Sequence, residues 1–287
     1  MFKKFFVLVI ILFFLGLLFF IFFKNDEKIA AINDISIYRK ELSLFSEVQK
    51  NCYKNKKINE EEVLAMLISD KLESAVLKKK YNLEPDLYIL TEKAKWIDKN
   101  TRDPKTLKCI ENIYSPFYKN FYFEDIVKPT LINPKLHSLF SQDREIHKEE
   151  IMKIEEIKKR LKENPEILKE LKEYQKATTS KTNKEKIDIG GYSFDTPEDP
   201  FISKVLSKLK KGKIFPDIVE DDYSFKIVRL IDEDKDNYYW DGVVIAKKNF
   251  DDWFKNYVKE NVKVKIFDKE LEKKFKTRYS DIWWPVE

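Results

Sequence analysis

The sequence predicts an α+β protein made of an N-terminal membrane helix, an all-helical domain, and a domain with a small antiparallel sheet and flanking helices. Three observations predict this fold class. The chain opens with a long apolar stretch, helix-spaced apolar residues dominate its first half, and short strand patterns alternate with helix patterns afterwards. We expect four segments: an anchor at 1–25, a helical domain at 26–132, a sheet-containing domain at 133–236, and a strand and helix segment at 237–287 that packs back on the helical domain.

The first segment predicts a membrane anchor. Phe5–Phe23 contains neither charged residues nor proline, and about 20 apolar residues are enough to cross a bilayer. Lys3 and Lys4 precede the stretch, whereas the charges at 24–28 cancel, so the N-terminus is expected in the cytoplasm. The bulk of this single-pass protein is then extracytoplasmic, on the periplasmic side of an inner membrane or the outer face of a plasma membrane. A cleaved signal peptide, with small residues at 30–31 near its end, is the alternative.

The charge composition argues against a nucleic-acid partner. The chain has 55 Lys and Arg residues against 50 Asp and Glu residues, which leaves a net charge of +5. Nucleic-acid binding needs basic residues clustered on one face, so we expect no nucleic-acid partner and interpret the charges as solvated helix faces.

The chain has two histidines and neither a CxxC nor an HExxH motif. No metal site and no other cofactor are therefore expected.

The two cysteines, Cys52 and Cys109, both follow the predicted anchor. An even pair in an oxidising compartment favours a disulfide. Two buried thiols in a helical core are an equally acceptable interpretation at this point.

The elements of the second segment follow from caps, prolines and apolar spacing. The helix that opens at Asn59 has three glutamates in its first turn, runs to about Tyr81, and includes Lys71 in its apolar register. The expected elements are, in order, a short strand from Ile29, a turn at Asn33-Asp34, helices opening at Ser36, Asn59, Pro85 and Pro104, and a stop at Pro129 and Pro134.

The third and fourth segments alternate between the two kinds of pattern. The third segment is expected to begin with strand Lys135–Phe140, helix Glu149–Arg160, a helix from Asn164-Pro165 and a turn at Gly190-Gly191. It continues with a helix from Phe201 to Gly212 and strand Phe225–Leu230. The fourth is expected to contain strand Tyr238–Ile245, helix Asn249–Tyr257, strand Val262–Ile266 and a helix from Asp268. Residues 243–276 are expected to belong with the N-terminal helices.

Several of these stretches together resemble SurA/PrsA-type extracytoplasmic chaperones that carry a parvulin-type peptidyl-prolyl isomerase domain. In the helical segment the resemblance rests on Ile29–Ile37, where Asp34 replaces a usual glycine, and on Leu67–Leu72. In the third segment it rests on Leu136–Phe140, on the Gly-Gly pair, and on Phe201–Ile214. It covers about residues 29–276 and implies a chaperone-like helical domain followed by a degenerate parvulin-like, or rotamase, α/β domain.

The resemblance also implies where isomerase chemistry would lie. The X-Pro bond has a rotational barrier of about 18–20 kcal/mol, and a catalyst must bind the twisted amide better than the planar forms. The family uses an apolar proline pocket backed by a polar network with two histidines. His137 matches the first histidine, and Lys226 stands in the place of the second. The candidate substrate-binding residues are Phe201, Pro197 and Phe225.

The sequence therefore predicts a membrane-anchored folding factor, a chaperone or holdase, for unfolded or newly exported polypeptides. Its parvulin-like domain is expected to be inactive, because Lys226 brings a fixed charge to a place where two imidazoles would share a proton. An active peptidyl-prolyl cis-trans isomerase is one alternative, and a non-catalytic scaffold of a membrane complex is another.

Overall fold

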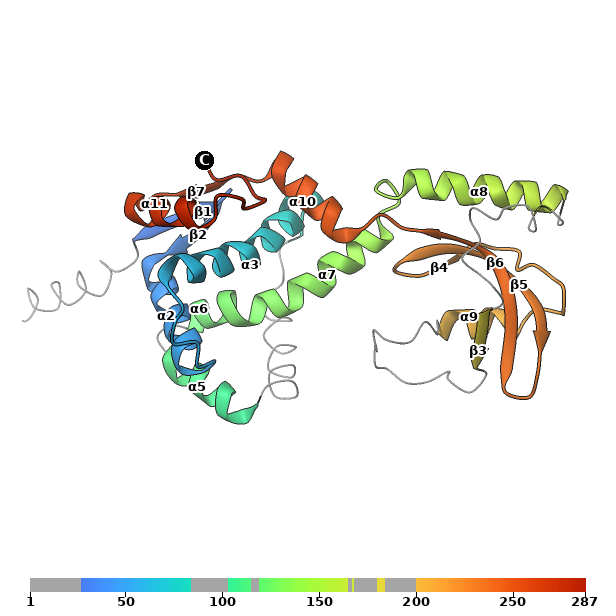
Figure 1. Cartoon of the computed structure of the whole chain (residues 1–287), viewed down its shortest axis with the longest axis horizontal. Coiled ribbons are helices and arrows are strands. Elements are labelled where there is room, and N and C mark those ends of the chain that lie inside the picture. The colour runs from blue at the N-terminus through green and yellow to red at the C-terminus, as the bar shows by residue number, and fades with distance from the viewer. Residues whose placement is uncertain (1–26, 84–102, 115–118, 165–166, 168–179, 184–199) are drawn as a thin grey trace, which may run out of the picture. The chain divides into compact units, whose positions relative to one another are not determined.

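A computed structural model describes residues 27–83, 103–114, 119–164, 167, 180–183 and 200–287 (Figure 1). Within them the protein is an α+β protein with two antiparallel sheets. The chain forms two compact units. Unit 1 contains residues up to Leu136 together with Asp251–Glu287, and unit 2 contains His137–Phe250. Unit 2 is thus inserted into the sequence of unit 1.

The sheet of unit 1 joins an early and a late segment of the chain. Strands β1 (Lys28–Ile32) and β2 (Ile35–Tyr38) form a hairpin, and β7 (Val264–Ile266) pairs with the other edge of β1. Asn33 takes the left-handed conformation that the tight turn requires, at φ 50°. The helix expected from Ser36 is therefore wrong at its start, because Ile35–Tyr38 pairs with β1 before any helix begins.

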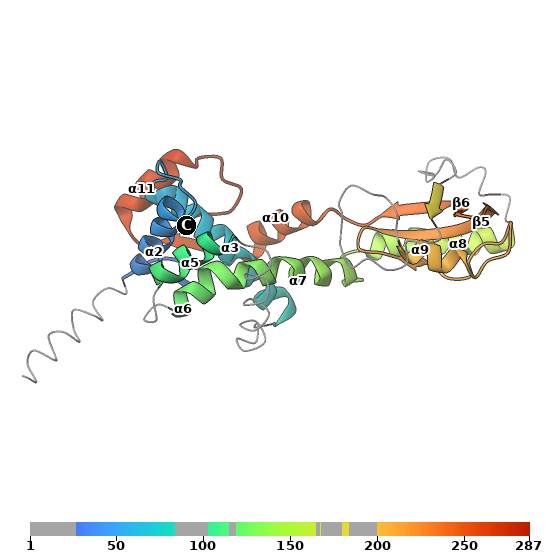
Figure 2. The ribbon, with the colours of Figure 1, turned by 90° about the horizontal axis from the view of Figure 1, so that it is seen from below.

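Helices pack against this sheet and make unit 1 an α+β unit, so the expectation of an all-helical domain at 26–132 is wrong. Helix α11 lies beside α3 in both ribbon views (Figures 1 and 2). The prediction for α3 is confirmed, because Asn59 caps it and Glu62 completes the capping box. The helical elements of unit 1 are α2 (Arg39–Asn51), α3 (Glu60–Tyr81), α5 (Pro104–Tyr114), α6 (Lys119–Tyr122), the π-helix η2 (Phe123–Val127), the first part of α7 (Lys128–Gln142), and α11 (Lys269–Arg278).

Helix α7 replaces the expected strand at Lys135–Phe140, so that prediction is wrong. The physical reason is the spacing of the buried residues: Ile132, Leu136 and Phe140 are buried four residues apart, which is a helical period. Pro134 lies inside the helix and does not end it. The boundary between the two units falls within α7.

Unit 2 has a four-stranded sheet in the order β3-β6-β5-β4 with a helix on each face (Figure 1). Helix α8 (Lys148–Glu163) packs on the face that carries Phe225 and Ile227. Helix α9 (Pro200–Leu206) packs on the opposite face, with Val228 and Leu230. The strands are β3 (Ser180–Asn183), β4 (Val219–Glu220), β5 (Ser224–Glu233) and β6 (Asn237–Ala246).

The β5–β6 hairpin sets a boundary that differs from the one expected at residue 236. Strand β6 pairs with β5 along nearly its whole length, so residues 237–250 lie in unit 2. At Gly242 the two strands approach so closely that a Cβ atom would lie 1.8 Å from the carbonyl oxygen of Ile227. Helix α10 (Phe250–Asn261) begins at the boundary, and the residues from Asp251 onward belong to unit 1.

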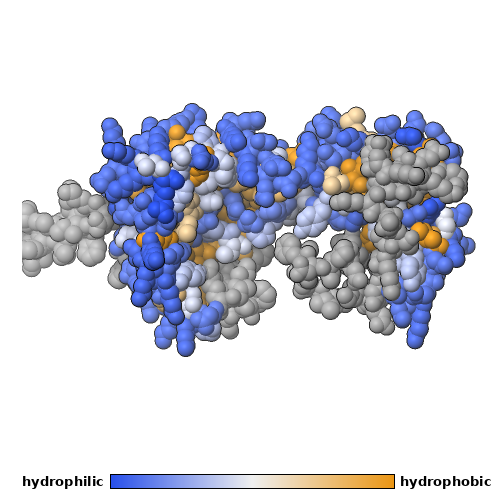
Figure 3. Space-filling view, viewed as in Figure 1, coloured by the Kyte–Doolittle hydropathy of each residue, from blue (hydrophilic) through white to orange (hydrophobic). Residues whose placement is uncertain are grey.

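Several predictions lie outside the described residues: the anchor Phe5–Phe23, the helices expected from Pro85 and Pro165, and the Gly190-Gly191 turn. Among the described residues, none of the helices combines the length and the apolar composition that a bilayer crossing requires. Hydrophilic residues cover most of the described surface on the face shown in Figure 3.

Candidate functional site

The two predicted catalytic residues are on different elements of unit 2. His137 is exposed on α7, and its ring stacks on Phe250 with 3.6 Å between the ring centroids. Lys226 is on β5, next to Phe225. Successive side chains of a strand point to opposite faces, so Lys226 projects to the α9 side of the sheet, whereas Phe225 projects to the α8 side.

Lys226 has a structural partner in the turn between β4 and β5. Its Nζ donates a hydrogen bond to Asp221 Oδ2, and both side chains are largely buried. Asp221 Oδ1 also accepts hydrogen bonds from the backbone of Tyr223 (2.8 Å) and Ser224 (2.6 Å). Burial raises the pKa of Asp221, but the hydrogen bond and charge of Lys226 outweigh it, and the pKa lies below its usual value. Lys226 therefore holds this turn against the sheet.

Of the predicted substrate-binding residues, the structure describes the side chain of Phe225 alone. Phe225 is buried in a core cluster with α8 residues such as Ile154 and Ile157. Phe201 lies in α9, with its side chain outside the described part of the structure, and Pro197 lies outside the described residues altogether. Phe225 is thus a core residue on the face opposite to Lys226.

The second histidine, His147, is the buried polar centre of this region, although sequence reasoning assigned it no role. Only 1% of its surface is exposed. Its Nε2 donates to the carbonyl oxygen of Phe140 at 3.0 Å, and its Nδ1 accepts from the backbone N–H of Lys248 at 3.3 Å. Burial, followed by the charge of Lys247, lowers the pKa of His147 despite the favourable hydrogen bond to Phe140. The ring is thus held neutral, with both nitrogens bonded to backbone.

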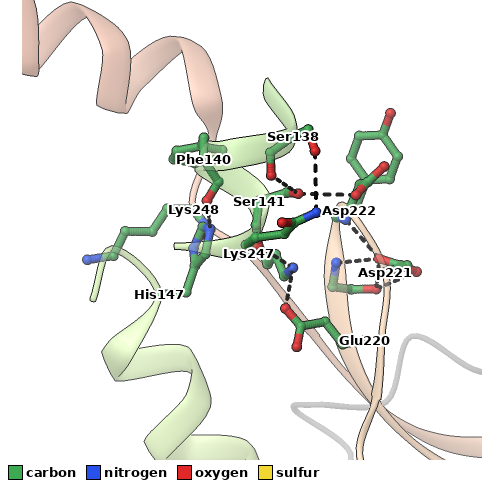
Figure 4. Close-up of polar contacts among 12 residues, drawn as sticks. Ser138, Phe140, Ser141, His147, Glu220, Asp221, Asp222, Lys247 and Lys248 are labelled. Atoms are coloured by element: carbon green, nitrogen blue, oxygen red, sulfur yellow. Dashed lines mark hydrogen bonds and ion pairs between the residues drawn. The ribbon is translucent and has the colours of Figure 1, made fainter. Parts of the chain in front are cut away.

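Lys247 is a buried cation beside His147 (Figure 4). Its Nζ donates to the carbonyl oxygen of Ser141 at 2.6 Å and to Glu220 Oε1 at 2.7 Å. The same ammonium group lies 4.9 Å from the centroid of the Phe225 ring, a favourable distance for a cation–π contact. The side chain is 3% exposed, so it joins the ends of α7, β4 and β6 and does not face solvent.

The remaining polar groups drawn in Figure 4 connect the same segments. Ser141 Oγ donates to Asp222 Oδ1 at 3.1 Å, which ties the end of α7 to the β4–β5 turn. The pattern Asp221-Asp222-Tyr223-Ser224 is a turn signal that the sequence does contain. The acid–base groups of this site are bonded to one another or to backbone, and the side chains of His147 and Lys247 are buried.

Unit 1 contains a second buried polar network. Lys71 Nζ lies 2.6 Å from Glu41 Oε1 and 3.7 Å from Asp125 Oδ1, and the hydroxyl of Tyr114 donates to Asp125 Oδ2 at 3.2 Å. All four residues are buried. Burial, together with the charge of Glu41, raises the pKa of Asp125 well above its usual value, although Lys71 opposes the shift. The ammonium group of Lys71 is therefore paired with two buried carboxyl groups.

The surface of unit 1 has an open pocket of about 650 Å³ beside α3 and the end of α11. The exposed side chain of Met66 lines it, and Arg278, another lining residue, forms an ion pair with Glu62. Its lining residues are Asn55, Lys57, Glu62, Ala65, Met66, Ser69, Arg278 and Tyr279. The pocket combines a flexible apolar side chain with charged groups of both signs.

The structure joins Cys52 and Cys109 in a disulfide, with the Cα atoms 5.7 Å apart. Cys52 ends α2, and Cys109 lies in α5. The bridge thereby fixes one helix of unit 1 against another, and it resolves the two interpretations of the cysteines in favour of the bonded pair.

Within the described ranges, His, Cys, Asp and Glu side chains do not gather into a group of three or more that would hold a metal ion. No family model, no curated protein and no solved structure matches the chain. The functional interpretation therefore depends on the residues, on their geometry and on the resemblance stated from the sequence.

Proposed function

We propose that the protein is a membrane-anchored extracytoplasmic holdase for unfolded or newly exported polypeptides, and that its inserted unit 2 does not catalyse prolyl isomerisation. The observation that carries the proposal is the path of the chain. Unit 2 interrupts the sequence of unit 1, and β7 returns to pair with β1. The resemblance to the SurA/PrsA-type chaperones implies this arrangement, in which the segment after the isomerase unit packs back on the N-terminal domain.

The geometry of unit 2 supports the non-catalytic part of the proposal. A prolyl isomerase of the type considered needs polar groups that converge behind an apolar pocket. Here Lys226 is bonded to Asp221 on one face of the sheet, and Phe225 fills the core on the other. His147 is buried and bonded to backbone at both ring nitrogens. These groups stabilise the fold of unit 2.

The open pocket of unit 1 supports polypeptide binding. Met66 is 39% exposed in it, and methionine side chains adapt to varied apolar partners because they are unbranched and flexible. Charged lining groups of both signs suit a chain of mixed composition. We therefore place client binding on this face of unit 1.

The test measures suppression of aggregation of a denatured client by residues 26–287, beside a protease-coupled assay on Xaa-Pro peptides. We expect suppression at near-stoichiometric ratios and isomerisation at the uncatalysed rate. Met66→Glu should weaken the suppression severalfold. Met152→Glu is the matched control, because Met152 is an exposed methionine on α8 of unit 2, 61% exposed.

Two results would contradict the proposal. Equal suppression of aggregation by Met66→Glu and Met152→Glu would show that clients do not bind in the pocket. Efficient isomerisation that disappears in His137→Ala would make unit 2 an active isomerase and restore His137 as a catalytic residue.

A further inference from the structure

Phe267, directly after β7, is one of the large apolar side chains that the structure leaves exposed, at 41%. Two ammonium groups lie near its ring: Lys28 Nζ is 5.1 Å and Lys265 Nζ is 5.6 Å from the ring centroid. We call these three residues the Phe267 patch. Both lysines are themselves exposed, so the patch presents an aromatic ring between two cations.

The charges around the Phe267 patch leave its two lysines without a carboxylate partner among the described residues. Lys28 and Lys265 contact the Phe267 ring, whereas the neighbouring charges are paired with one another. Arg39 bridges Glu27 and Asp268. The patch is therefore both apolar and positively charged, although the chain contains 50 acidic residues.

The alternation along β7 places the patch on one outward face. Val264 and Ile266 are buried, whereas Lys265 and Phe267 are exposed. The backbone N–H of Phe267 donates to the carbonyl oxygen of Ile29 at 2.7 Å, which fixes the ring beside the start of β1. The sheet therefore holds the patch in place.

Glu27, the first described residue after the predicted anchor, is fixed beside the same patch. The backbone N–H of Arg39 donates to the carbonyl oxygen of Glu27 at 2.8 Å, and Arg39 Nε lies 3.4 Å from Glu27 Oε2. Only residues 24–26 separate Glu27 from Phe23, the last apolar residue of the anchor stretch. A fully extended chain covers those steps in at most about 14 Å, and the headgroup layer extends about 5–8 Å beyond the hydrocarbon.

We propose that the Phe267 patch docks unit 1 on anionic lipid headgroups of the membrane that holds the anchor. Phe267 enters the interface, and Lys28 and Lys265 bind lipid phosphates. Aromatic rings favour the membrane interface, and lysines near an anionic surface are attracted to it. The inference rests on the proposed anchored topology, because the short connection keeps the patch at a high effective concentration near the headgroups.

The test uses the full chain in vesicles, with the photo-crosslinking residue p-benzoyl-phenylalanine in place of Phe267. Irradiation in phosphatidylcholine vesicles with about 30% phosphatidylglycerol should give lipid adducts at position 267, detected by mass spectrometry. Adducts should fall about tenfold in pure phosphatidylcholine, in about 0.5 M salt, and in the double variant Lys28→Gln/Lys265→Gln. The same crosslinker in place of Tyr223, which is 69% exposed in unit 2, marks the background.

A matched charge control uses Lys208→Gln/Lys213→Gln, two exposed lysines of unit 2, which should leave the adducts at position 267 unchanged. Equal adducts with both lipid compositions would overturn the proposal, and so would failure of the chain to insert in vesicles. Crosslinking of position 267 to an added acidic polypeptide in preference to lipid would also overturn it. Aggregation suppression, measured on the same samples, separates this proposal from the holdase proposal. The Lys28→Gln/Lys265→Gln variant should suppress aggregation as the wild type does. A wild type that does not suppress aggregation would refute only the holdase proposal.

Discussion

At the scale of single residues, both units bury ionisable groups that serve as structural links. In unit 2, His147 joins the end of α7 to the segment after β6 through two backbone hydrogen bonds. In unit 1, Lys71 joins α3 to Glu41 of α2 and to Asp125. The two links respond to pH in opposite directions, because the pKa of His147 is lowered and that of Asp125 is raised.

The first prediction concerns the pH dependence of unit 2. The unfolded chain protonates His147 as pH falls below about 6.5, whereas the folded chain keeps the ring neutral to a lower pH. The neutral ring therefore contributes its full share of the free energy of unfolding above about pH 6.5. This contribution is lost as pH falls toward the pKa of His147 in the folded chain. Urea unfolding of unit 2, measured from pH about 7.5 downward, should show little change above pH about 6.5 and a progressive loss below it.

His147→Gln provides the comparison, because glutamine retains a donor and an acceptor but does not titrate in this range. The variant should be less stable at neutral pH by about 1–3 kcal/mol, and its stability should vary less with pH over the same interval. The other charges that act on His147 are Lys247, Glu150 and Asp143, which remain in the variant. An unchanged pH profile in His147→Gln would assign the dependence to other groups.

The second prediction concerns Lys71. Lys71→Met removes the cation that is paired with the buried carboxyl groups of Glu41 and Asp125, so the free energy of unfolding of unit 1 should fall by about 3–5 kcal/mol. The control is Lys78→Met on the same helix, because the Lys78–Asp34 pair is exposed and such pairs contribute at most about 1 kcal/mol. Comparable losses in the two variants, measured by denaturant unfolding, would contradict this assignment.

The sequence anticipated one of these buried groups better than the other. Lys71 falls in the apolar register of a helix that the structure confirms from Glu60 to Tyr81, so its burial was visible in the pattern. His147 was not predictable in this way. It lies just before α8, and its two partners are backbone groups, one of which is 101 residues away in the sequence. Side-chain patterns contain no signal for such contacts.

At the scale of elements, the sequence predicts the helices and strands whose caps and apolar patterns lie within the element itself. Asp268 caps α11, and the strand expected at Tyr238–Ile245 lies within β6. The expected strand at Lys135–Phe140 is the clearest failure. Its apolar residues suit either a short strand or a helix, and the buried period of four emerges only when Ile132 is included. His137, which the resemblance places on the first strand, is therefore on a helix.

The third prediction concerns the disulfide that joins α2 to α5. A bridge with a sequence separation of 57 residues restricts the unfolded chain and should stabilise unit 1 by about 4 kcal/mol in the loop-entropy model. Reduction, or the double variant Cys52→Ser/Cys109→Ser, should lower the melting temperature of unit 1. Unit 2 contains no cysteine, so its transition serves as the internal control. Two alkylatable thiols in the unfolded, non-reduced protein would refute the bridge.

At the scale of the whole chain, the two ends of the sequence form one unit and the middle forms another. The sequence predicts a C-terminal segment that packs on the N-terminal helices, with the boundary between the third and fourth segments at residue 236, before β6. The hairpin partner of β5 lies across that division, and strand pairing depends on register between distant residues that apolar patterns do not specify. The structure moves the division to residues 250–251.

The fourth prediction follows from this division. Ending the chain at Phe250 removes β7, which pairs with β1, and α11, whose buried residues Leu271 and Phe275 belong to the core of unit 1. Unit 1 should then lose its cooperative unfolding transition, while unit 2 keeps its own because its sheet is complete. Hydrogen exchange provides the measurement: amides of β1 should lose protection, and amides of β5 and β6 should keep theirs.

A double variant tests the same coupling without shortening the chain. Leu271→Ala/Phe275→Ala removes the buried face of α11 and should lower the stability of unit 1 by several kcal/mol, since each large core side chain contributes about 2–5 kcal/mol. Lys273→Ala/Lys276→Ala changes exposed positions of the same helix and should have little effect. If β1 amides stay protected after the chain is ended at Phe250, the first part of the chain folds alone, and the C-terminal segment is an accessory to it and not a part of its core.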